Sequence, residues 1–194
     1  TSVVTPAALG AGRTNLVERT FNSTKITGAL ASTGQDFWNM TTGQTAFAYA
    51  GTDAKKGWYL ELPISGERVL QSAEFLSGSN ILQIKSIVPA SGGSTTGNIA
   101  ETCTPNSIPA KGYLTLMGIE QGLKPTVQLL DADGDGVYNS ASAKDNDTNR
   151  TTTSPEEIAL RGVGEQLRVG SDGKTRKIAE PPAPDLTINW RQLQ

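Results

Sequence analysis

The stretches 57-GWYLELP-63 and 81-ILQIKSIVP-89 carry the clearest structural signal in this sequence. Apolar and polar residues alternate along both, which is the period of a half-buried β-strand. Each stretch ends at a proline, which cannot donate a backbone hydrogen bond to a neighbouring strand. Gly66 marks a turn between them, and residues 67–70 follow as a further short strand. We therefore predict a sheet built from short strands and turns.

The same pattern continues on either side of these two stretches. We expect further strands within residues 16–30, 112–117, 126–130, 167–169, 176–178 and 186–190. Two hairpins are predicted: 112–117 pairs with 126–130, and 167–169 pairs with 176–178 across residues 170–173. Residues 154–157 (SPEE) are typical of a short helix start, with serine at the N-cap and proline in the first turn. Residues 31–54 are predicted to form a long loop that aromatic side chains hold to the core.

The composition supports the same fold class, because threonine and glycine are abundant and helical apolar spacing is rare. The predicted fold is mostly β, with partial β-propeller-like or β-sandwich-like antiparallel sheets, long loops and at most one short helix. We divide the chain into an N-terminal arm (1–15), a β-rich domain (16–180) with a calcium loop at 131–147, and a Pro-rich extended tail (181–194) with a final strand.

The residue counts exclude several kinds of chemistry. The 194-residue chain contains no histidine, which rules out a Ser-His-Asp triad, a Cys-His pair and a His-based zinc site. Its one cysteine, Cys103, permits no disulfide within the chain; it is either an inert thiol or one that has lost its partner. With 17 basic and 19 acidic side chains and no Lys/Arg block, the chain is not expected to bind nucleic acid or an anionic membrane. No apolar run approaches the roughly 18 residues of a membrane span.

One loop, 131-DADGDGV-137, has the residue types of a metal site. Asp131, Asp133 and Asp135 occupy positions 1, 3 and 5, a glycine occupies position 6, and the carbonyl of Val137 stands at position 7. Hard oxygen ligands on an adaptable loop suit Ca²⁺ better than zinc or copper. Three carboxylates at ligand distance repel one another without a cation.

The twelfth position of this loop departs from the calcium-loop pattern, because it is Ser142 and not an acid. Asp145 or Asp147 is expected to complete the ligand set after a short insertion. The metal ligands that we predict are Asp131, Asp133, Asp135, Val137 and Asp145. The alternative is a solvated acidic turn, since Asp, Gly and Asn are also ordinary turn residues.

Other candidate residues point less clearly to chemistry. A catalytic carboxylate pair could be sought among Glu61, Glu67 and Glu74, but alternation places some of them on the solvent face. Trp38, Trp58 and Trp190 are interpreted as core or edge anchors, with a sugar-stacking platform as the alternative. We expect no enzymatic activity, because no carboxylate pair for a carbohydrate-processing enzyme can be placed.

Several motifs in order resemble the C-terminal region of the PilC/PilY family, the large type IV pilus-associated proteins. The motifs are 16-LVERT-20 and 37-FW-38, then 56-KGWYLEL-62 and 66-GERVL-70, the strand ending at Pro89, the loop cysteine, the loop at 131–137 and the ending 188-INWRQL-193. The resemblance covers about residue 16 to the end of the chain.

This resemblance implies a calcium-binding, β-propeller-like C-terminal domain on the cell surface or the pilus tip, with roles in pilus assembly, retraction control and adhesion. It assigns Asp131, Asp133 and Asp135 as calcium ligands. The family's proteins are several times longer, so this chain would hold only the end of the propeller region and would leave sheet edges unpaired.

The sequence thus predicts a non-enzymatic, calcium-binding extracellular or cell-surface protein. Its partners would be pilus proteins, other copies of itself added at exposed sheet edges, or a host or surface receptor. The alternative is a structural subunit of a self-assembling extracellular filament built by strand addition.

Overall fold

The computed structural model describes residues 12–26, 35–76, 78–92, 107–142, 145 and 147–181. Its elements are η1 (Gly12–Asn15), β1 (Leu16–Arg19), β2 (Phe37–Trp38), β3 (Gly57–Leu60), β4 (Glu74–Phe75), β5 (Ile81–Val88), β6 (Ser91–Gly92), β7 (Ser107–Ile108), β8 (Lys111–Gly118), β9 (Arg150–Thr153), β10 (Glu157–Arg161), β11 (Glu165–Gly170) and β12 (Thr175–Ala179). Helical backbone in these ranges is confined to η1 and a turn that contains Asp145 and Asp147. The prediction of a mostly β chain is confirmed.

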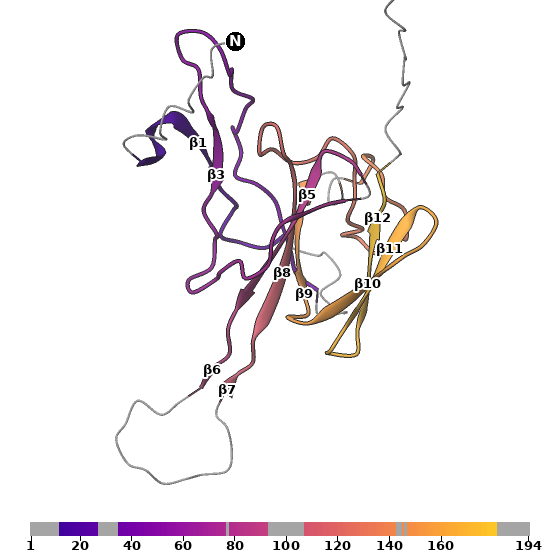
Figure 1. The fold of residues 1–194 in the computed structure, drawn as a ribbon. Helices are drawn as coiled ribbons and strands as arrows, with labels where there is room; N and C mark the ends of the chain where they lie inside the picture. The colour runs from indigo at the N-terminus through magenta and orange to yellow at the C-terminus, as the bar shows by residue number, and fades with distance from the viewer. Residues whose placement is uncertain are drawn as a thin grey trace, which may run out of the picture.

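A five-stranded antiparallel sheet with the order β2-β9-β8-β5-β4 forms the centre of the fold (Figure 1). Its longest ladder joins β5 to β8 over eight residues each, from Ile81 opposite Gly118 to Val88 opposite Lys111. The two strands continue outward into the short β6–β7 pair. The strand predicted at 81–89 is therefore the one that organises the sheet.

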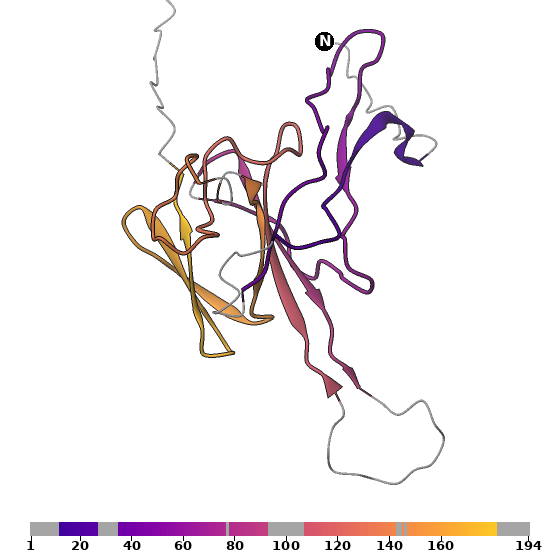
Figure 2. The ribbon, with the colours of Figure 1, turned by 180° about the vertical axis from the view of Figure 1, so that it is seen from behind.

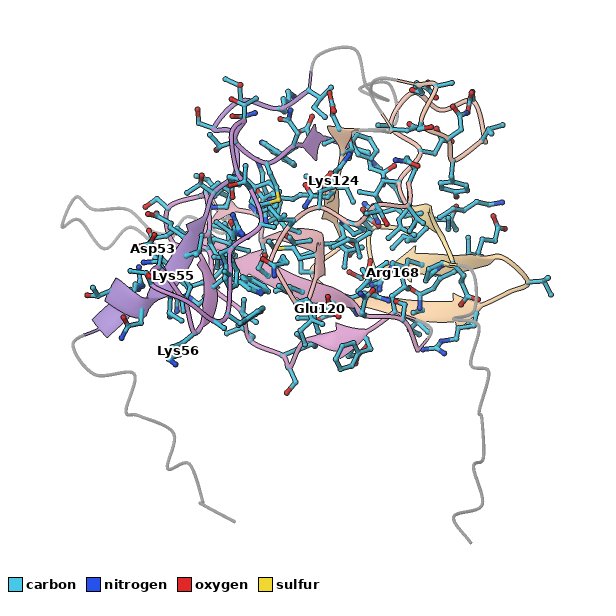
Figure 3. All side chains as sticks on the ribbon, turned by 90° about the horizontal axis from the view of Figure 1, so that it is seen from above. Asp53, Lys55, Lys56, Glu120, Lys124 and Arg168 are labelled. Atoms are coloured by element: carbon cyan, nitrogen blue, oxygen red, sulfur yellow. The ribbon has the colours of Figure 1, made fainter. Side chains whose placement is uncertain are left out.

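A three-stranded antiparallel sheet, β10-β11-β12, packs on one face of the five-stranded sheet. The main core lies between them and contains Phe37, Leu76, Ile81, Leu114, Leu116, Leu129, Leu130, Ala132, Ile178 and Ala179. Arg168 of β11 also points into this layer, where it bonds Gln83 of β5 and Glu157 of β10 (Figure 3). None of the sheets in the described ranges closes on itself, so the sandwich-like form of the prediction fits and the propeller-like form is not confirmed.

Described residues from the first third of the chain, among them Phe21, Met40 and Leu60, pack on the opposite face of the five-stranded sheet, and β1 and β3 lie to its side (Figure 2). A second core forms there from Phe21, Trp38 and Tyr113, with the rings of Trp38 and Tyr113 5.7 Å apart in an edge-to-face arrangement. Strands β1 and β3 pair in parallel, unlike the antiparallel pairing that we expected. The connection through residues 20–56 is long enough to bring the chain back in the same direction.

Two predicted elements are wrong. Residues 126–130 form no strand, and β8 pairs with β5 and β9 instead of with that segment. Leu129 and Leu130 are both buried in the main core, which neighbouring residues of a regular strand, facing opposite ways, would not be. The expected helix after Ser154 is the strand β10, because Gly162–Gly164 turns the chain back and β11 supplies a full ladder.

Other predicted elements agree better with the structure. The hairpin predicted at 167–178 is β11–β12, and the long loop is anchored by Phe37 and Trp38, which form β2. Of residues 67–70, only Arg68 makes a β-bridge, to Ile87. The strand at 186–190, Cys103, Trp190, most of the N-terminal arm and nearly all of the tail lie outside the described residues.

An ion pair between Glu67 and Arg150 is buried on the second-core side of the sheet. The Nη2 atom of Arg150 lies 2.7 Å from Oε1 of Glu67, and both side chains are fully buried. Arg150 also donates to Thr115 Oγ1 at 2.8 Å, and its guanidinium lies 4.5 Å from the ring centre of Tyr113. Ser86 donates a further hydrogen bond to Glu67. The pair therefore joins residues 83 positions apart in the sequence.

Replacing one member of this pair will destabilise the fold strongly. We expect Arg150→Met to lower the free energy of unfolding by about 3–5 kcal/mol, because it leaves the Glu67 carboxylate buried without its cation. The double variant Glu67→Gln/Arg150→Met should lose less than the single variant. Urea denaturation followed by tryptophan fluorescence measures both; the exposed Arg13–Glu61 pair supplies the control, since Glu61→Gln should change little. An equal loss in Glu61→Gln and Arg150→Met would contradict this expectation.

Candidate metal centre

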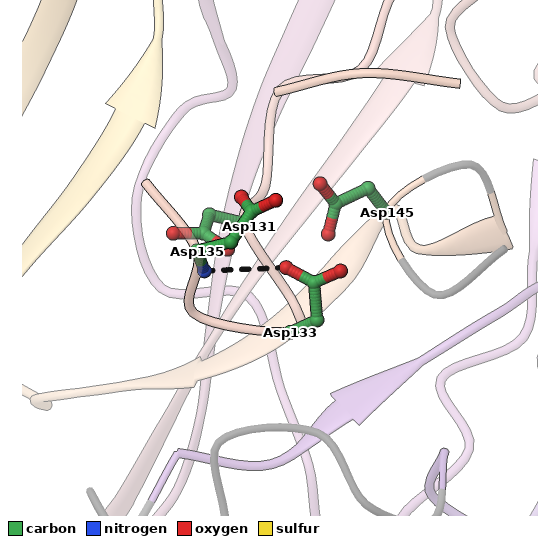
Figure 4. Close-up of side chains that lie close together, drawn as sticks. All are labelled: Asp131, Asp133, Asp135 and Asp145. Carbon is green, nitrogen blue, oxygen red and sulfur yellow. Dashed lines mark hydrogen bonds between the residues drawn. The ribbon is translucent and has the colours of Figure 1, made fainter. Parts of the chain in front are cut away.

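The acidic loop begins where the chain leaves the main core. Leu129 and Leu130 are buried, and Ala132, which lies between two of the aspartates, is fully buried as well. The backbone is therefore held on both sides of Asp131 by apolar packing. Asp133 and Asp135 come next in the loop (Figure 4).

Two glycines allow the loop to fold back on Asp131. Gly134 and Gly136 have φ angles of 81° and 82°, in the left-handed region that favours glycine. Their amides donate to the two oxygens of Asp131: Gly134 to Oδ1 at 2.6 Å and Gly136 to Oδ2 at 2.9 Å. Asp135 donates its amide to Asp133 Oδ1 at 3.3 Å. These contacts turn the carboxylates toward one point.

Asp145 reaches the same point from the turn that follows the loop. One carboxylate oxygen from each of Asp131, Asp133, Asp135 and Asp145 lies within 4.8 Å of the others. Asp145 is only 1% exposed, and its Oδ1 accepts the amide of Ala132 at 2.7 Å. Its other oxygen, Oδ2, is buried and has no hydrogen-bond partner among the described residues. A buried carboxylate oxygen without a donor is costly unless a cation satisfies it.

The sequence left two acids, Asp145 and Asp147, as candidates for the last ligand, and the structure places only one of them in the cluster. Asp145 joins the cluster, whereas Asp147 is exposed and lies outside it. Ser142, at the twelfth position of the loop, donates its hydroxyl to Asp133 Oδ2 at 2.6 Å and so orients that carboxylate. Its role as a donor to Asp133 was not predicted, because the sequence pattern shows only that an acid is missing there. Val137 donates its amide to Asp135 Oδ1 at 2.7 Å, and a ligand role for its carbonyl stays a prediction.

The clustered carboxylates contribute to the raised pKa values of two neighbouring groups. Burial raises the pKa of Asp145, and repulsion from Asp133 and Asp131 raises it further. Burial also raises the pKa of Tyr138 to about 12, with added contributions from Glu165, Asp131 and Asp145. Two carboxylates about 4 Å apart near a protein surface repel by about 4 kcal/mol. Four of them in one place favour a cation at their centre.

The other candidates from the sequence do not gather at a site. Glu61 forms a surface ion pair with Arg13, Glu74 is exposed, and Glu67 is buried against Arg150, so the structure brings no two of these glutamates together. Trp38 belongs to the second core. Trp58 donates Nε1–H to the Ile119 carbonyl at 2.7 Å and anchors β3.

A close approach fixes the position of Trp58. A Cβ atom at Gly122, whose φ is +61°, would lie 2.2 Å from the indole ring. The ring therefore lies directly on this backbone, and the interpretation of Trp38 and Trp58 as anchors is supported by their contacts.

Asp145→Asn tests how much the buried charge of Asp145 lowers the stability of the fold when no cation is bound. The raised pKa means that the folded state binds the Asp145 proton more tightly than the unfolded state does. Ionisation therefore costs stability as the pH rises above the ordinary aspartate value of about 4. In chelator, we expect Asp145→Asn to melt at a higher temperature than the parent protein at pH 7, with the difference shrinking toward pH 4. Asp147→Asn is the matched control, and a destabilised Asp145→Asn protein at pH 7 would contradict the expectation.

Comparisons with known proteins bear on the fold. No protein-family model matches the chain, and no curated protein matches its sequence. Among the helical segments of the described ranges, none combines the length and the apolar character needed to cross a bilayer. The structure is similar to the crystal structure of the Pseudomonas aeruginosa PilY1 C-terminal domain, with a TM-score of 0.58 and 15% sequence identity, over 88% of this chain and 33% of that chain. This chain thus spans about a third of the chain that it matches, and it has a PilY1 C-terminal-domain-like fold.

Proposed function

We propose that this chain is a non-enzymatic, calcium-binding surface protein related in role to the C-terminal region of pilus-associated PilC/PilY proteins. The observation that carries the calcium part is the buried Oδ2 atom of Asp145. It has no donor among the described residues, and its carboxylate faces three others within 4.8 Å. A cation at this point would satisfy the orphaned oxygen and remove the repulsion among the four carboxylates.

The donor set favours calcium over other metals. Asp131, Asp133, Asp135 and Asp145 offer only carboxylate oxygens, and the Val137 carbonyl would add another oxygen ligand. Oxygen donors on a loop with two positive-φ glycines suit the larger and more variable coordination of Ca²⁺, whereas Mg²⁺ demands a tight octahedron. Bound calcium would hold the loop against the main core, so its role would be to stabilise the fold.

Calcium will raise the thermal stability of the protein. At a hundredfold excess over the dissociation constant, a ligand specific for the folded state adds about 2.7 kcal/mol, which corresponds to roughly 5–10 °C in Tm for a domain of this size. We expect this shift with CaCl₂ relative to chelator, and a smaller one with MgCl₂. Asp145→Asn should lose the calcium shift and Asp147→Asn should keep it. An unchanged Tm at millimolar calcium would show that the loop is an acidic turn.

The surface role is supported by the PilY1-like fold together with the motif order that the sequence shares with the family. We propose a location with type IV pili outside the cell, where millimolar calcium would keep the loop occupied, and pilus proteins as the partners. A host or surface receptor is a further candidate partner.

Co-sedimentation with purified type IV pili tests this association. We expect the chain to pellet with pili in calcium and to remain in the supernatant in chelator, because the loop and the surfaces next to it are ordered by the ion. Asp145→Asn is the variant to compare with the parent protein, and Asp147→Asn is its control. If the chain stays in the supernatant under all conditions while calcium still raises its Tm, the pilus association is wrong and the calcium site stands.

A further inference from the structure

Strand β10 is an edge of the three-stranded sheet in the part of the chain that the structure describes. The order is β10-β11-β12, and β10 uses one side only, in a ladder to β11 that runs from Glu157 opposite Gly170 to Arg161 opposite Gln166. An edge strand of this kind presents backbone donors and acceptors to another chain.

The hydrogen bonds at the two ends of the ladder show which groups face outward. Gly162 donates its amide to the Glu165 carbonyl at 2.8 Å, and Ser171 donates to the Glu156 carbonyl at 2.9 Å. Hydrogen-bonded pairs alternate along an antiparallel ladder, so the even-numbered residues of β10 bond to β11. The amides and carbonyls of Glu157, Ala159 and Arg161 therefore point away from β11, along the free edge.

The middle of β10 carries no residue that protects this edge. Natural edges are often blocked by proline, charged side chains or a bulge; 157-EIALR-161 has no proline and no bulge, and its two charged residues, Arg161 and the inward-pointing Glu157, stand at its ends. Ile158 is 69% exposed and Leu160 is 53% exposed, on the face of the sheet that points away from the main core. They lie beside Val169 and Leu167 of β11, so an apolar strip runs along the edge.

The sequence of β10 is complementary to itself when read in the opposite direction. In an antiparallel pair centred on Ala159, Ile158 of one copy stands opposite Leu160 of the other, and Glu157 stands opposite Arg161. Ala159 then faces Ala159, and the outward amides and carbonyls exchange hydrogen bonds in both directions. We propose that two copies of this chain associate through β10 in this register, which joins their three-stranded sheets into one continuous sheet.

The charged and apolar pairs of this contact contribute unequally to the affinity of the dimer. Glu157 already bonds to Arg168 and lies 3.7 Å from Lys85, so its pairing with Arg161 sets the direction of the strands and adds little energy. The backbone bonds and the buried Ile158–Leu160 pairs supply the affinity. A two-fold contact closes after two copies, so β10 makes a dimer, and the filament considered from the sequence would need a second, different contact.

The first test removes a backbone donor that only the dimer uses. The amide of Ala159 faces outward, so Ala159→Pro leaves the β10–β11 bonds intact and removes the central donor of the contact. We expect the dimer dissociation constant, measured by sedimentation velocity across a concentration series, to rise by at least about tenfold. Ala159→Thr keeps the donor and should keep the dimer. Circular dichroism and thermal melting check that both variants fold.

A charge swap tests the register. Ile158→Lys should weaken the dimer, and Ile158→Lys/Leu160→Lys should abolish it. Ile158→Lys/Leu160→Glu places lysine opposite glutamate across the two-fold axis and should restore association relative to Ile158→Lys alone. A parent chain that is monomeric throughout the series, or a dimer that Ala159→Pro does not weaken, would overturn the proposal; failure of the swap would overturn the register. The parent dimer should persist in Asp145→Asn, so this result is independent of calcium.

Discussion

The fold depends on a salt bridge that is removed from water. Glu67 precedes β5 and Arg150 begins β9, so their contact fixes the segment before the long hairpin against the far side of the same sheet. Desolvating both charges is costly, and the cost is offset only when the geometry and the remaining hydrogen bonds are good. Thr115, Ser86 and the face of Tyr113 supply part of those contacts, whereas Oε2 of Glu67 and Nε of Arg150 are buried without a hydrogen-bond partner among the described residues. The aromatic second core then packs around the guanidinium, within 6 Å of the rings of Phe21 and Trp38.

A second buried arginine has a comparable role between the two sheets. Arg168 of β11 bonds Glu157 of the neighbouring strand and Gln83 of the five-stranded sheet. The chain contains only 36% hydrophobic residues, and its threonines and glycines fill little volume. Long arginine side chains therefore occupy space that leucine or phenylalanine fills in other sandwiches, and their planar, multidentate heads find fixed partners there. Because these contacts are directional, they set the relative position of the sheets as well as filling the space between them.

The acidic loop uses this rigid framework in a different way. Leu129, Leu130 and Ala132 hold its beginning on the main core, and the Ala132 amide holds Asp145 from the other end. The four carboxylates are thus brought together by packing and by amide donors, against their mutual repulsion. A cation at their centre would offset this repulsion, so the loop would be held most firmly with an ion bound. The same packing explains why a cation there would stabilise the whole sandwich.

Local pattern was enough to predict the fold class and three members of the acidic cluster. The alternation of residues 81–89 and the turn at 170–173 gave the strands β5, β11 and β12, and the spacing of Asp131, Asp133 and Asp135 singled out the loop. The likeness to the PilY1 C-terminal domain agrees with the motif order read from the sequence.

Other features depended on contacts between residues far apart in the chain. The segment 154–161 has a good helix start, yet it is a strand because β11 offers a complete ladder and Arg168 offers a partner for Glu157. Residues 126–130 alternate like a strand in sequence, but they form none, and the neighbours Leu129 and Leu130 are both buried in the main core. The choice of Asp145 over Asp147 came from which side chain the turn buries. Sequence alone thus determined the fold class, several of the strands and the position of the aspartate-rich loop along the chain. Tertiary structure decided which further segments become strands, which strands pair and which charges are buried, because those outcomes depend on the free energy of long-range contacts that no local pattern contains.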